Sequence, residues 1–458
     1  MTKFTRRDFL AGIAVTGASS LTGHSDGALA DAQTGRATSG PAQAGASKLA
    51  ADKLIAYFTG VAPKLLRPPK GVLRHPSISP SLPGKTYSTT LWDWDTYWTA
   101  RGLFRLAKLA GDQILHQSVA EHARGSLLNF LDHQSDEGRI PIMMDTNDAD
   151  PFGCLRSGAP NTNNQAKPVM GQLALLIADE LGEVAWLEPR FGQLLRFYDS
   201  WMLGNQAKLG LLVWGDDVAI GDDNDPTTFG RPFFSSANLL LNCLYYEDLR
   251  AAAELAHRLS RSRDEQKLAH RADELKARIQ EFCWDPRDRF YYTADVQCVD
   301  RRAELIPHVA RGMGMSWKCL PLRIQMFTGF LPLWCGLASK EQAHELLHRH
   351  YLNSDKFRAA SGVRSLSAEE SMYSLVRSSN PSNWLGPIWI IVNYFAWKGF
   401  KNYGFEEAAA DLSDKTIRVL CDDLSTSGSL NEYYDPDTGK PLSHSGFIDW
   451  NMLVLEMV

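Results

Sequence analysis

Helical hydrophobic patterning recurs along most of the chain and constrains its fold more than any other feature. Strand-like alternation is scarce and short, as in Arg289-Phe290-Tyr291-Tyr292. About a dozen helices joined by long polar loops predict an all-α domain, either a helical bundle, a solenoid or an α/α toroid. No strict repeat of solenoid length is visible. We expect helices from Lys48 to Pro63 and near residues 95–109, 113–132, 165–181, 185–203, 235–259, 264–283, 322–336, 340–351, 386–400, 405–423 and 446–457.

The N-terminus has the three parts of a twin-arginine export signal. The arginine pair lies in Thr5-Arg6-Arg7-Asp8-Phe9-Leu10, a weakly apolar stretch follows to Leu21, and Ala28-Leu29-Ala30 offers a cleavage site. We therefore expect a signal peptide at 1–30, a disordered leader at 31–46 and one catalytic domain at 47–458. This organisation predicts a periplasmic or secreted protein that has the twin-arginine machinery as a partner during export.

Charge and cysteine content exclude several classes of protein. A formal charge of −5 and a pI near 6.2 give no electrostatic basis for binding nucleic acid. No later apolar run is long enough to predict a membrane span. The seven cysteines form no C-x-x-C pair, and their odd number argues against a complete disulfide framework. Unpaired cysteines fit a protein that is exported in the folded state.

The segment Leu91-Trp92-Asp93-Trp94-Asp95-Thr96-Tyr97-Trp98 is hard to explain by core packing alone. Each aspartate, if buried, would need a partner to offset its desolvation. The flat face of a pyranose, however, stacks on an indole, and sugar hydroxyls donate to carboxylates. The segment therefore predicts a sugar-binding surface. The alternative is an aromatic helix N-terminus in which Asp93 or Asp95 is the capping acid.

Five aspartates crowd the glycine-containing loop from Trp214 to Pro226. Like charges this close raise one another's pKa, which can keep a carboxylic acid protonated at neutral pH. The loop lacks Gly and Glu at the EF-hand offsets, so we do not expect a calcium site. A solvated acidic turn is the alternative.

Two later segments carry further candidates. Trp384 and Trp389 flank Pro387, which fits the first turn of a helix, and they predict a second aromatic platform or, alternatively, core packing. Glu432 precedes the turn Asp435-Pro436-Asp437-Thr438-Gly439 between polar and aromatic neighbours. Taken alone, Glu432 is better explained as an exposed loop residue than as a cleft residue.

No metal or organic cofactor is expected. His344-Glu345-Leu346-Leu347-His348 matches the H-E-x-x-H zinc signature. On that helix, however, Ala343, Leu346 and Leu347 form the apolar stripe, the histidines fall among polar residues, and no third ligand follows at a metzincin spacing. Arg311-Gly312-Met313-Gly314-Met315-Ser316 lacks the third glycine and the preceding strand of a dinucleotide-binding loop.

Together and in this order, the motifs resemble the trehalase-like inverting glycosidases, in particular glycoside hydrolase family 63 with its bacterial mannosylglycerate and glucosylglycerate hydrolases. The resemblance covers residues 75–458. Two positions depart from the family pattern: Lys167 stands where Pro is usual, and Leu385 stands where Arg is usual. The matching segments are Trp92-Asp93-Trp94-Asp95, Gln165-Ala166-Lys167-Pro168, Gly221-Asp222-Asp223-Asn224-Asp225-Pro226, Asn383-Trp384-Leu385-Gly386-Pro387-Ile388-Trp389 and Glu432-Tyr433-Tyr434-Asp435-Pro436.

The resemblance implies an (α/α)6 toroid, the six-hairpin glycosidase barrel, that hydrolyses a small α-glucoside or α-mannoside from one end with inversion. It assigns the general acid to Asp223, with Asp225 left open, and the general base to Glu432, with the two carboxyl groups roughly 6.5–9.5 Å apart. It also implies substrate contacts by Trp92, Asp95, Gln165, Trp214, Gly221, Trp384 and Trp389.

Two other functions remain possible on the same scaffold. A polysaccharide lyase would need a Tyr/His or Arg/His base pair and a basic cleft, and the acidic loop at 215–225 argues against it. A non-catalytic sugar-binding protein would tolerate the loss of Asp223 and Glu432.

Overall fold

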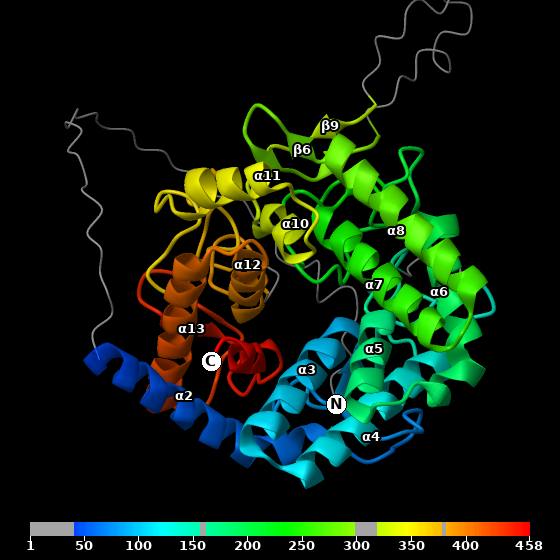
Figure 1. Ribbon diagram of the computed structural model, residues 1–458, viewed down its shortest axis with the longest axis horizontal. Coiled ribbons are helices and arrows are strands. Elements are labelled where there is room, and N and C mark those ends of the chain that lie inside the picture. The colour runs from blue at the N-terminus through cyan, green and yellow to red at the C-terminus, as the bar shows by residue number, and fades with distance from the viewer. Residues whose placement is uncertain (1–40, 156–161, 298–317, 378–381) are drawn as a thin grey trace, which may run out of the picture.

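The helices form a closed two-layered ring in the computed structural model, which describes residues 41–155, 162–297, 318–377 and 382–458 (Figure 1). Short 3₁₀ segments are η1 (Ala62–Leu65), η2 (Ala185–Arg190), η3 (Phe327–Phe330) and η5 (Trp450–Glu456), and η4 (Leu346–Tyr351) is a π-helical turn. The α-helices are α2 (Pro41–Val61), α3 (Asp93–Ala110), α4 (Gln113–Asp132), α5 (Met170–Leu181), α6 (Phe191–Asn205), α7 (Leu239–Arg258), α8 (Ser262–Phe282), α10 (Leu331–Trp334), α11 (Lys340–Glu345), α12 (Ile390–Asn402) and α13 (Glu406–Ser427).

The inner layer is a continuous circuit of packed elements. Following the chain, α3 packs against α5, α5 against α7, α7 against α10, α10 against α12 and α12 against η5, and η5 returns to α3. The outer layer covers this circuit: α4 packs against α3 and α5, α8 against α7, α13 against α12, and α2 against α13 (Figure 1). The first and last helical elements of the domain therefore lie side by side and close the ring.

The residue patterns of the helices explain which layer each one occupies. In α12, the run Ile390-Ile391-Val392-Asn393-Tyr394-Phe395-Ala396 is buried without interruption, as expected of a helix covered on several sides. In α8, by contrast, only Leu268, Ala272, Leu275 and Ile279 are buried. These four residues form one stripe at helical spacing, which faces α7, while the charged remainder faces solvent.

The strands are two or three residues long and serve as clips between loops. All of their pairings are antiparallel. Because the strands are so short, the described chain still belongs to the all-α class. Two of the pairs position the site: β3 with β4, and β10 with β11. The strands are β1 (Leu66–Arg67) with β2 (Ser77–Ile78), β3 (Thr90–Trp92) with β4 (Met143–Asp145), β5 (Ser236–Ala237) with β8 (Ala294–Asp295) and β9 (Leu320–Pro321), β6 (Trp284–Asp285) with β7 (Phe290–Tyr291), and β10 (Tyr433–Tyr434) with β11 (Pro441–Ser443).

Several predicted helices begin later than expected. The prediction at 113–132 agrees with α4, whose N-cap Asp112 accepts a hydrogen bond from the Leu115 N–H. The predictions at 165–181 and 386–400 were too long, because the helices start at Met170 and Ile390. Pro168 and Pro387 disfavour helical geometry in the residues before them, which leaves those segments as loops. The predicted helix at 446–457 is a 3₁₀ segment that starts at Trp450.

Parts of the predicted N-terminal organisation lie outside the described residues. Helix α2 begins at Pro41, so residues 41–46 of the predicted leader are helical, whereas residues 1–40 are not described. Five cysteines of the described chain are free thiols and buried: Cys154, Cys243, Cys283, Cys335 and Cys421. Cys298 lies outside it. No helix in the described ranges is long and apolar enough to cross a membrane.

Candidate active site

A cavity lies where five remote segments of the chain meet, and its empty space, counted together with the solvent at its mouth, is about 430 Å³. The segments are the region from Tyr87 to the N-terminal end of α3, the turn before α5, the acidic loop before α7, the segment before α12 and the segment from Glu432 to η5. Seven of the residues expected to contact or cleave the substrate line it: Trp92, Asp95, Gly221, Asp223, Trp384, Trp389 and Glu432. The remaining lining residues are Tyr87, Trp94, Lys167, Ala219, Ser382 and Trp450.

Asp223 is held on the cavity by a sharply turned loop. Gly221, two residues before it, has φ +104°, a backbone conformation that favours glycine. A Cβ at that position would lie 3.1 Å from the Lys167 side chain and 3.1 Å from the Trp94 ring, so the close approach also requires glycine. Burial raises the pKa of Asp223 to about 6. The charge of Glu432 adds to this increase, whereas Lys167 and a hydrogen bond from Ser382 oppose it.

Asp225, the other candidate acid, has a structural role in the same loop. Its carboxylate accepts hydrogen bonds from the Thr227 backbone N–H at 2.7 Å, the Thr227 hydroxyl at 2.8 Å and the Asn238 amide at 2.7 Å. Asn238 is the N-cap of α7, so these bonds fix the loop to the start of that inner helix. Asp225 does not line the cavity, and the arrangement therefore favours Asp223 as the acid.

The loop that carries Asp223 is also tied to the tryptophan segment. The Asn224 side chain accepts a hydrogen bond from the Trp384 backbone N–H at 2.7 Å, and its amide donates to Asn383 at 3.3 Å. Trp384 and Trp389 stack on each other with ring centroids 3.9 Å apart and an interplanar angle of 6°. Trp389 in turn contacts Trp450, which contacts Trp94. These four indoles form a continuous aromatic wall around the cavity.

Glu432 directly precedes β10 and is positioned by the β10–β11 hairpin. Its backbone N–H donates to the Ser443 carbonyl at 3.1 Å, and Trp450 Nε1 donates to the Glu432 carbonyl at 3.4 Å. The residue is 3 % exposed, and its Oε2 forms a hydrogen bond with Nδ1 of His444 that is also an ion pair when the imidazole is protonated. Burial raises the pKa of the Glu432 carboxyl, and His444 opposes this increase.

A second pair of carboxyl groups, Asp95 and Asp449, lies beside the first. Burial raises the pKa of Asp95 to about 7, and the charge of Asp93 contributes further. Asp449 is fully buried, accepts a hydrogen bond from the Thr99 hydroxyl at 2.8 Å, and has its pKa raised well above the ordinary value by burial and by Asp95. A hydrogen bond joins Asp95 to Asp449, which requires a proton on one of the two carboxyl groups.

Two residues expected to contact the substrate, Gln165 and Trp214, are not among those that line the cavity. Gln165 is 1 % exposed, and its amide bonds to the Ser200 hydroxyl at 3.0 Å and to the Ile140 backbone. Trp214 is 1 % exposed and packs edge-on against Trp201 with centroids 5.9 Å apart. Both side chains pack behind the cavity and support its wall.

Lys167, where the family pattern has Pro, contributes a buried cation to the cavity. Its Nζ lies 3.1 and 3.2 Å from the two oxygens of Asp93 and donates to the Ala219 carbonyl at 3.1 Å. The ammonium also lies 5.5 Å from the centre of the Trp94 ring. Lys167 and Asp93 are 2 % and 0 % exposed, so this pair neutralises both charges beneath the cavity floor.

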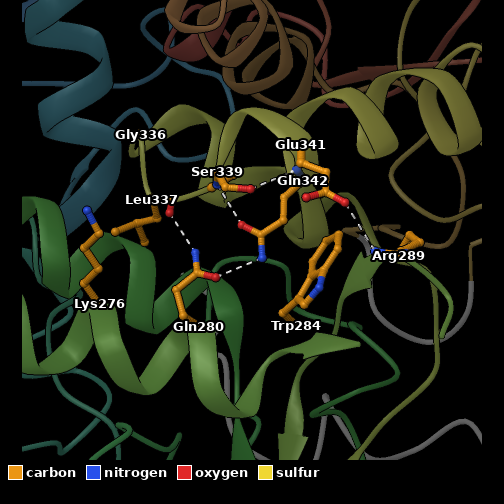
Figure 2. Close-up of a pocket in the computed structure, with 10 residues that line it drawn as sticks. Lys276, Gln280, Trp284, Arg289, Gly336, Leu337, Ser339, Glu341 and Gln342 are labelled. Atoms are coloured by element: carbon orange, nitrogen blue, oxygen red, sulfur yellow. Dashed lines mark hydrogen bonds and ion pairs between the residues drawn. The ribbon is translucent and has the colours of Figure 1, made fainter. Parts of the chain in front are cut away.

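A second cavity lies between α8 and the α10–α11 connection, away from these carboxyl groups (Figure 2). Its polar groups bond to one another. The Gln280 side chain donates to the Leu337 backbone carbonyl at 2.7 Å, and the Gln342 side chain donates to the Gln280 side chain at 3.0 Å. Ser339 and Gln342 form the capping box of α11. These groups hold the outer helices together, and the lining contains a single carboxylate, Glu341.

No group of three His, Cys, Asp or Glu side chains in the described part of the chain is arranged to hold a metal ion. His344 and His348 of the H-E-x-x-H segment pack ring to ring with centroids 4.1 Å apart. Ala343, Leu346 and Leu347 are buried, which confirms the predicted apolar stripe of that helix. His350, however, is also buried, whereas the sequence placed it among the polar residues.

Comparison with known proteins identifies the family. Residues 88–448 match the family model described as the mannosylglycerate hydrolase MGH1-like glycoside hydrolase domain. The chain belongs to this family. It is 29 % identical over 139 residues to a mannosylglycerate hydrolase of Thermus thermophilus and 30 % identical over 122 residues to a glucosylglycerate hydrolase of Mycolicibacterium hassiacum. These stretches cover 30 % and 25 % of this chain and 31 % and 24 % of those relatives.

Solved structures place the MGH1-like domain in a known fold. The family 63 mannosylglycerate hydrolase from Thermus thermophilus in complex with glucose aligns with a TM-score of 0.61 at 19 % identity, over 85 % of this chain and 96 % of that one. The neutral trehalase from Saccharomyces cerevisiae aligns with a TM-score of 0.55 at 15 % identity, over 84 % of this chain and 74 % of that one. These similarities confirm the predicted (α/α)6 toroid.

Proposed function

We propose that the protein is an exo-acting, inverting α-glycosidase that hydrolyses a small α-glucoside or α-mannoside. The observation that carries this proposal is the convergence of the half-buried Asp223 and the buried Glu432, from remote segments, on one tryptophan-walled cavity. Membership of the MGH1-like family supports the same reaction class. The reaction requires no metal or organic cofactor, and the expected partner is a small carbohydrate.

Asp223 acts as the general acid. Its pKa of about 6 lets it hold a proton in mildly acidic solution, and it gives that proton to the departing glycosidic oxygen. Glu432 acts as the general base in its ionised form and takes a proton from the attacking water. A separation of roughly 6.5–9.5 Å between the carboxyl groups leaves room for that water on the opposite face of the sugar and gives inversion.

The remaining lining residues bind the sugar at the cleavage point. Trp92 offers apolar surface to a pyranose face, and Asp95 forms hydrogen bonds with its hydroxyls. Trp384 and Trp389, which are fully buried and stacked on each other, support the cavity wall. The relatives named above are mannosylglycerate and glucosylglycerate hydrolases, and a trehalase shares the fold. Mannosylglycerate, glucosylglycerate and trehalose are therefore the first substrates to test.

The test is hydrolysis of these three compounds and a set of short α-gluco- and α-manno-oligosaccharides, with the product anomer followed by NMR. We expect the wild type to release the β-anomer first. D223N and E432Q should each lower kcat by roughly 10³-fold or more, because each removes a proton-transfer group that the step requires. For wild type, kcat/KM should fall above about pH 6, where Asp223 loses its proton.

D217N is the matched control from the same loop. Asp217 accepts a hydrogen bond from the Gly230 N–H and does not line the cavity, so D217N should retain turnover. Unchanged turnover in both D223N and E432Q would reject the assignment. Sugar binding without hydrolysis in the wild type would indicate a non-catalytic sugar-binding protein, and release of an unsaturated product would indicate a lyase.

A further inference from the structure

His444 contacts the carboxylate of Glu432 directly. It follows β11, whereas Glu432 precedes β10, the other strand of the same hairpin. In the β10–β11 pairing, Tyr433 lies opposite Ser443, which brings the residues just before and after this pair together. Nδ1 of His444 bonds to Oε2 of Glu432, and the Ser443 hydroxyl lies 3.0 Å from the same nitrogen. These two contacts fix the orientation of the imidazole, with Nδ1 toward the carboxylate.

The backbone of His444 is held in an unfavourable conformation to make this contact. Its φ is +43°, in the left-handed region, which is uncommon for residues other than glycine. Such strain persists where the surrounding structure enforces it and is frequent at functional sites. Here the Tyr87 ring packs edge-on against the imidazole with centroids 5.7 Å apart, and Tyr87 itself lines the cavity.

We propose that His444 is a positioning residue for the general base: its Nδ1–H donates to Oε2 of Glu432 and leaves Oε1 to orient and deprotonate the attacking water. An ionised carboxylate only accepts hydrogen bonds, so the contact requires the proton on Nδ1. The inference rests on the proposed glycosidase function, in which Glu432 is the base.

The surroundings of Glu432 explain why it needs such a donor. Besides His444, the titratable and charged groups that face it are Asp223 from the acidic loop, Asp449 before η5, and Tyr87 and Tyr433. Lys167, the lysine that lines the cavity, is already bonded to Asp93. Burial disfavours the charge on Glu432 and raises its pKa, and the contact with His444 opposes that increase.

The experiment compares H444F with H444N. H444F keeps an aromatic ring against Tyr87 but removes the donor, whereas H444N keeps an N–H at the position of Nδ1 and suits a left-handed backbone. We expect H444F to lower kcat roughly 10- to 100-fold with little change in KM, through misplacement of the base. The acidic limb of its pH profile should move to higher pH, because the pKa of an unsupported Glu432 rises and the base must be ionised to act. H444N should retain most of the turnover and the position of the limb.

His116 supplies a matched control. Its Nε2 lies 2.9 Å from Oε2 of Glu180, and its side chain is 19 % exposed, as is that of His444, but it does not line the cavity. H116F should leave kcat and the pH profile unchanged. Unchanged kcat and an unmoved acidic limb in H444F would overturn the proposal. So would equal losses in H444F and H444N, since these would indicate a purely steric role.

A spectroscopic measurement separates this proposal from the proposed function. In protein with ¹⁵N-labelled histidine, the resonances absent from H444N identify His444, and its neutral ring should carry the proton on Nδ1 in wild type but not in E432A, which removes the acceptor. Retention of that tautomer in E432A would overturn the pairing. A wild type without turnover on any sugar would instead overturn the proposed function, and the tautomer would still decide whether Glu432 binds His444.

Discussion

Lys167 stands where the family pattern has Pro, and its contacts bear on both the stability of the fold and the pKa of Asp223. It forms a buried ion pair with Asp93, and the charge of Lys167 lowers the pKa of Asp223. Removal of one member of a buried ion pair leaves the other charge uncompensated. Lys167 therefore links the stability of the ring to the protonation of the proposed acid.

We predict that K167M lowers the free energy of unfolding by about 3–5 kcal/mol, measured by denaturant titration. The double variant K167M/D93N should recover part of this loss. In whatever activity K167M retains, the alkaline limb of the pH profile should move to higher pH, because the pKa of Asp223 rises without the nearby cation. K108M, at an exposed pair with Glu180, is the control and should cost at most about 1 kcal/mol. Equal losses in K167M and K108M would contradict the prediction.

The sequence motifs predicted most of the residues that line the cavity, but not every motif residue lies there. Trp92, Asp95, Gly221, Asp223, Trp384, Trp389 and Glu432 all line the cavity, whereas Gln165 and Trp214 do not. Gln165 and Trp214 lie in loops, where the direction of a side chain depends on tertiary contacts such as the Gln165–Ser200 hydrogen bond. His444 had no motif to mark it, because its role depends on hairpin register and on one positive φ.

At the scale of single elements, the π-helical turn η4 buries an ionisable group. His350 is 2 % exposed, its Nε2–H donates to the Asp288 carbonyl at 3.1 Å, and its ring packs against Phe290 with centroids 4.6 Å apart. Burial lowers the pKa of His350 from 6.5 to about 4, and the charges of Lys356 and Arg349 contribute. The folded protein thus favours the neutral ring.

This turn should make the protein sensitive to mild acid. The unfolded chain binds a proton at His350 more readily than the folded chain between pH 6.5 and about 4, so stability is lost as the pH falls through that window, by roughly 2–3 kcal/mol. H350Q keeps a donor to the Asp288 carbonyl without the titration. The difference in unfolding free energy between wild type and H350Q should therefore shrink or reverse from pH 7 to pH 4.

H344Q, at an exposed position on the preceding helix, is the control and should run parallel to wild type across the same range. A wild-type minus H350Q difference that does not depend on pH would contradict the assignment.

Helix type was easier to predict than helix ends. In long outer helices such as α8, the spacing of one apolar stripe predicts the helix, and in α4 the capping Asp112 predicts where the helix begins. Elements of the inner layer were harder, because the segments before α5 and α12 contribute Lys167, Trp384 and Trp389 to the site instead of continuing the helix. Tertiary contacts overrode local pattern at those positions.

At the scale of the whole molecule, we propose that the protein is exported in the folded state. Cys154, Cys243, Cys283, Cys335 and Cys421 are free thiols buried in the ring, and a ring that holds free thiols is compatible with folding before export. The signal peptide that would direct export, residues 1–30, is a sequence-based proposal.

We predict that R6K/R7K blocks export, because both arginines of the pair are altered. The measurement is the distribution of the full-length protein between cytoplasmic and periplasmic or secreted fractions in a host with a twin-arginine system. Active protein should accumulate in the cytoplasm. K3Q, at a nearby cationic position outside the pair, is the control and should be exported normally. Unchanged export of R6K/R7K would reject the predicted localisation.

The closure of the ring has a consequence for biosynthesis. The chain emerges from the ribosome N-terminus first, so α3 is made long before η5, its neighbour in the inner layer. Until then, the side of α3 that η5 covers has no partner, and the pocket lacks Glu432 and Trp450. A nascent chain is therefore an open arc without a complete site. Its catalytic competence and its protection from aggregation begin together, when the last turn docks.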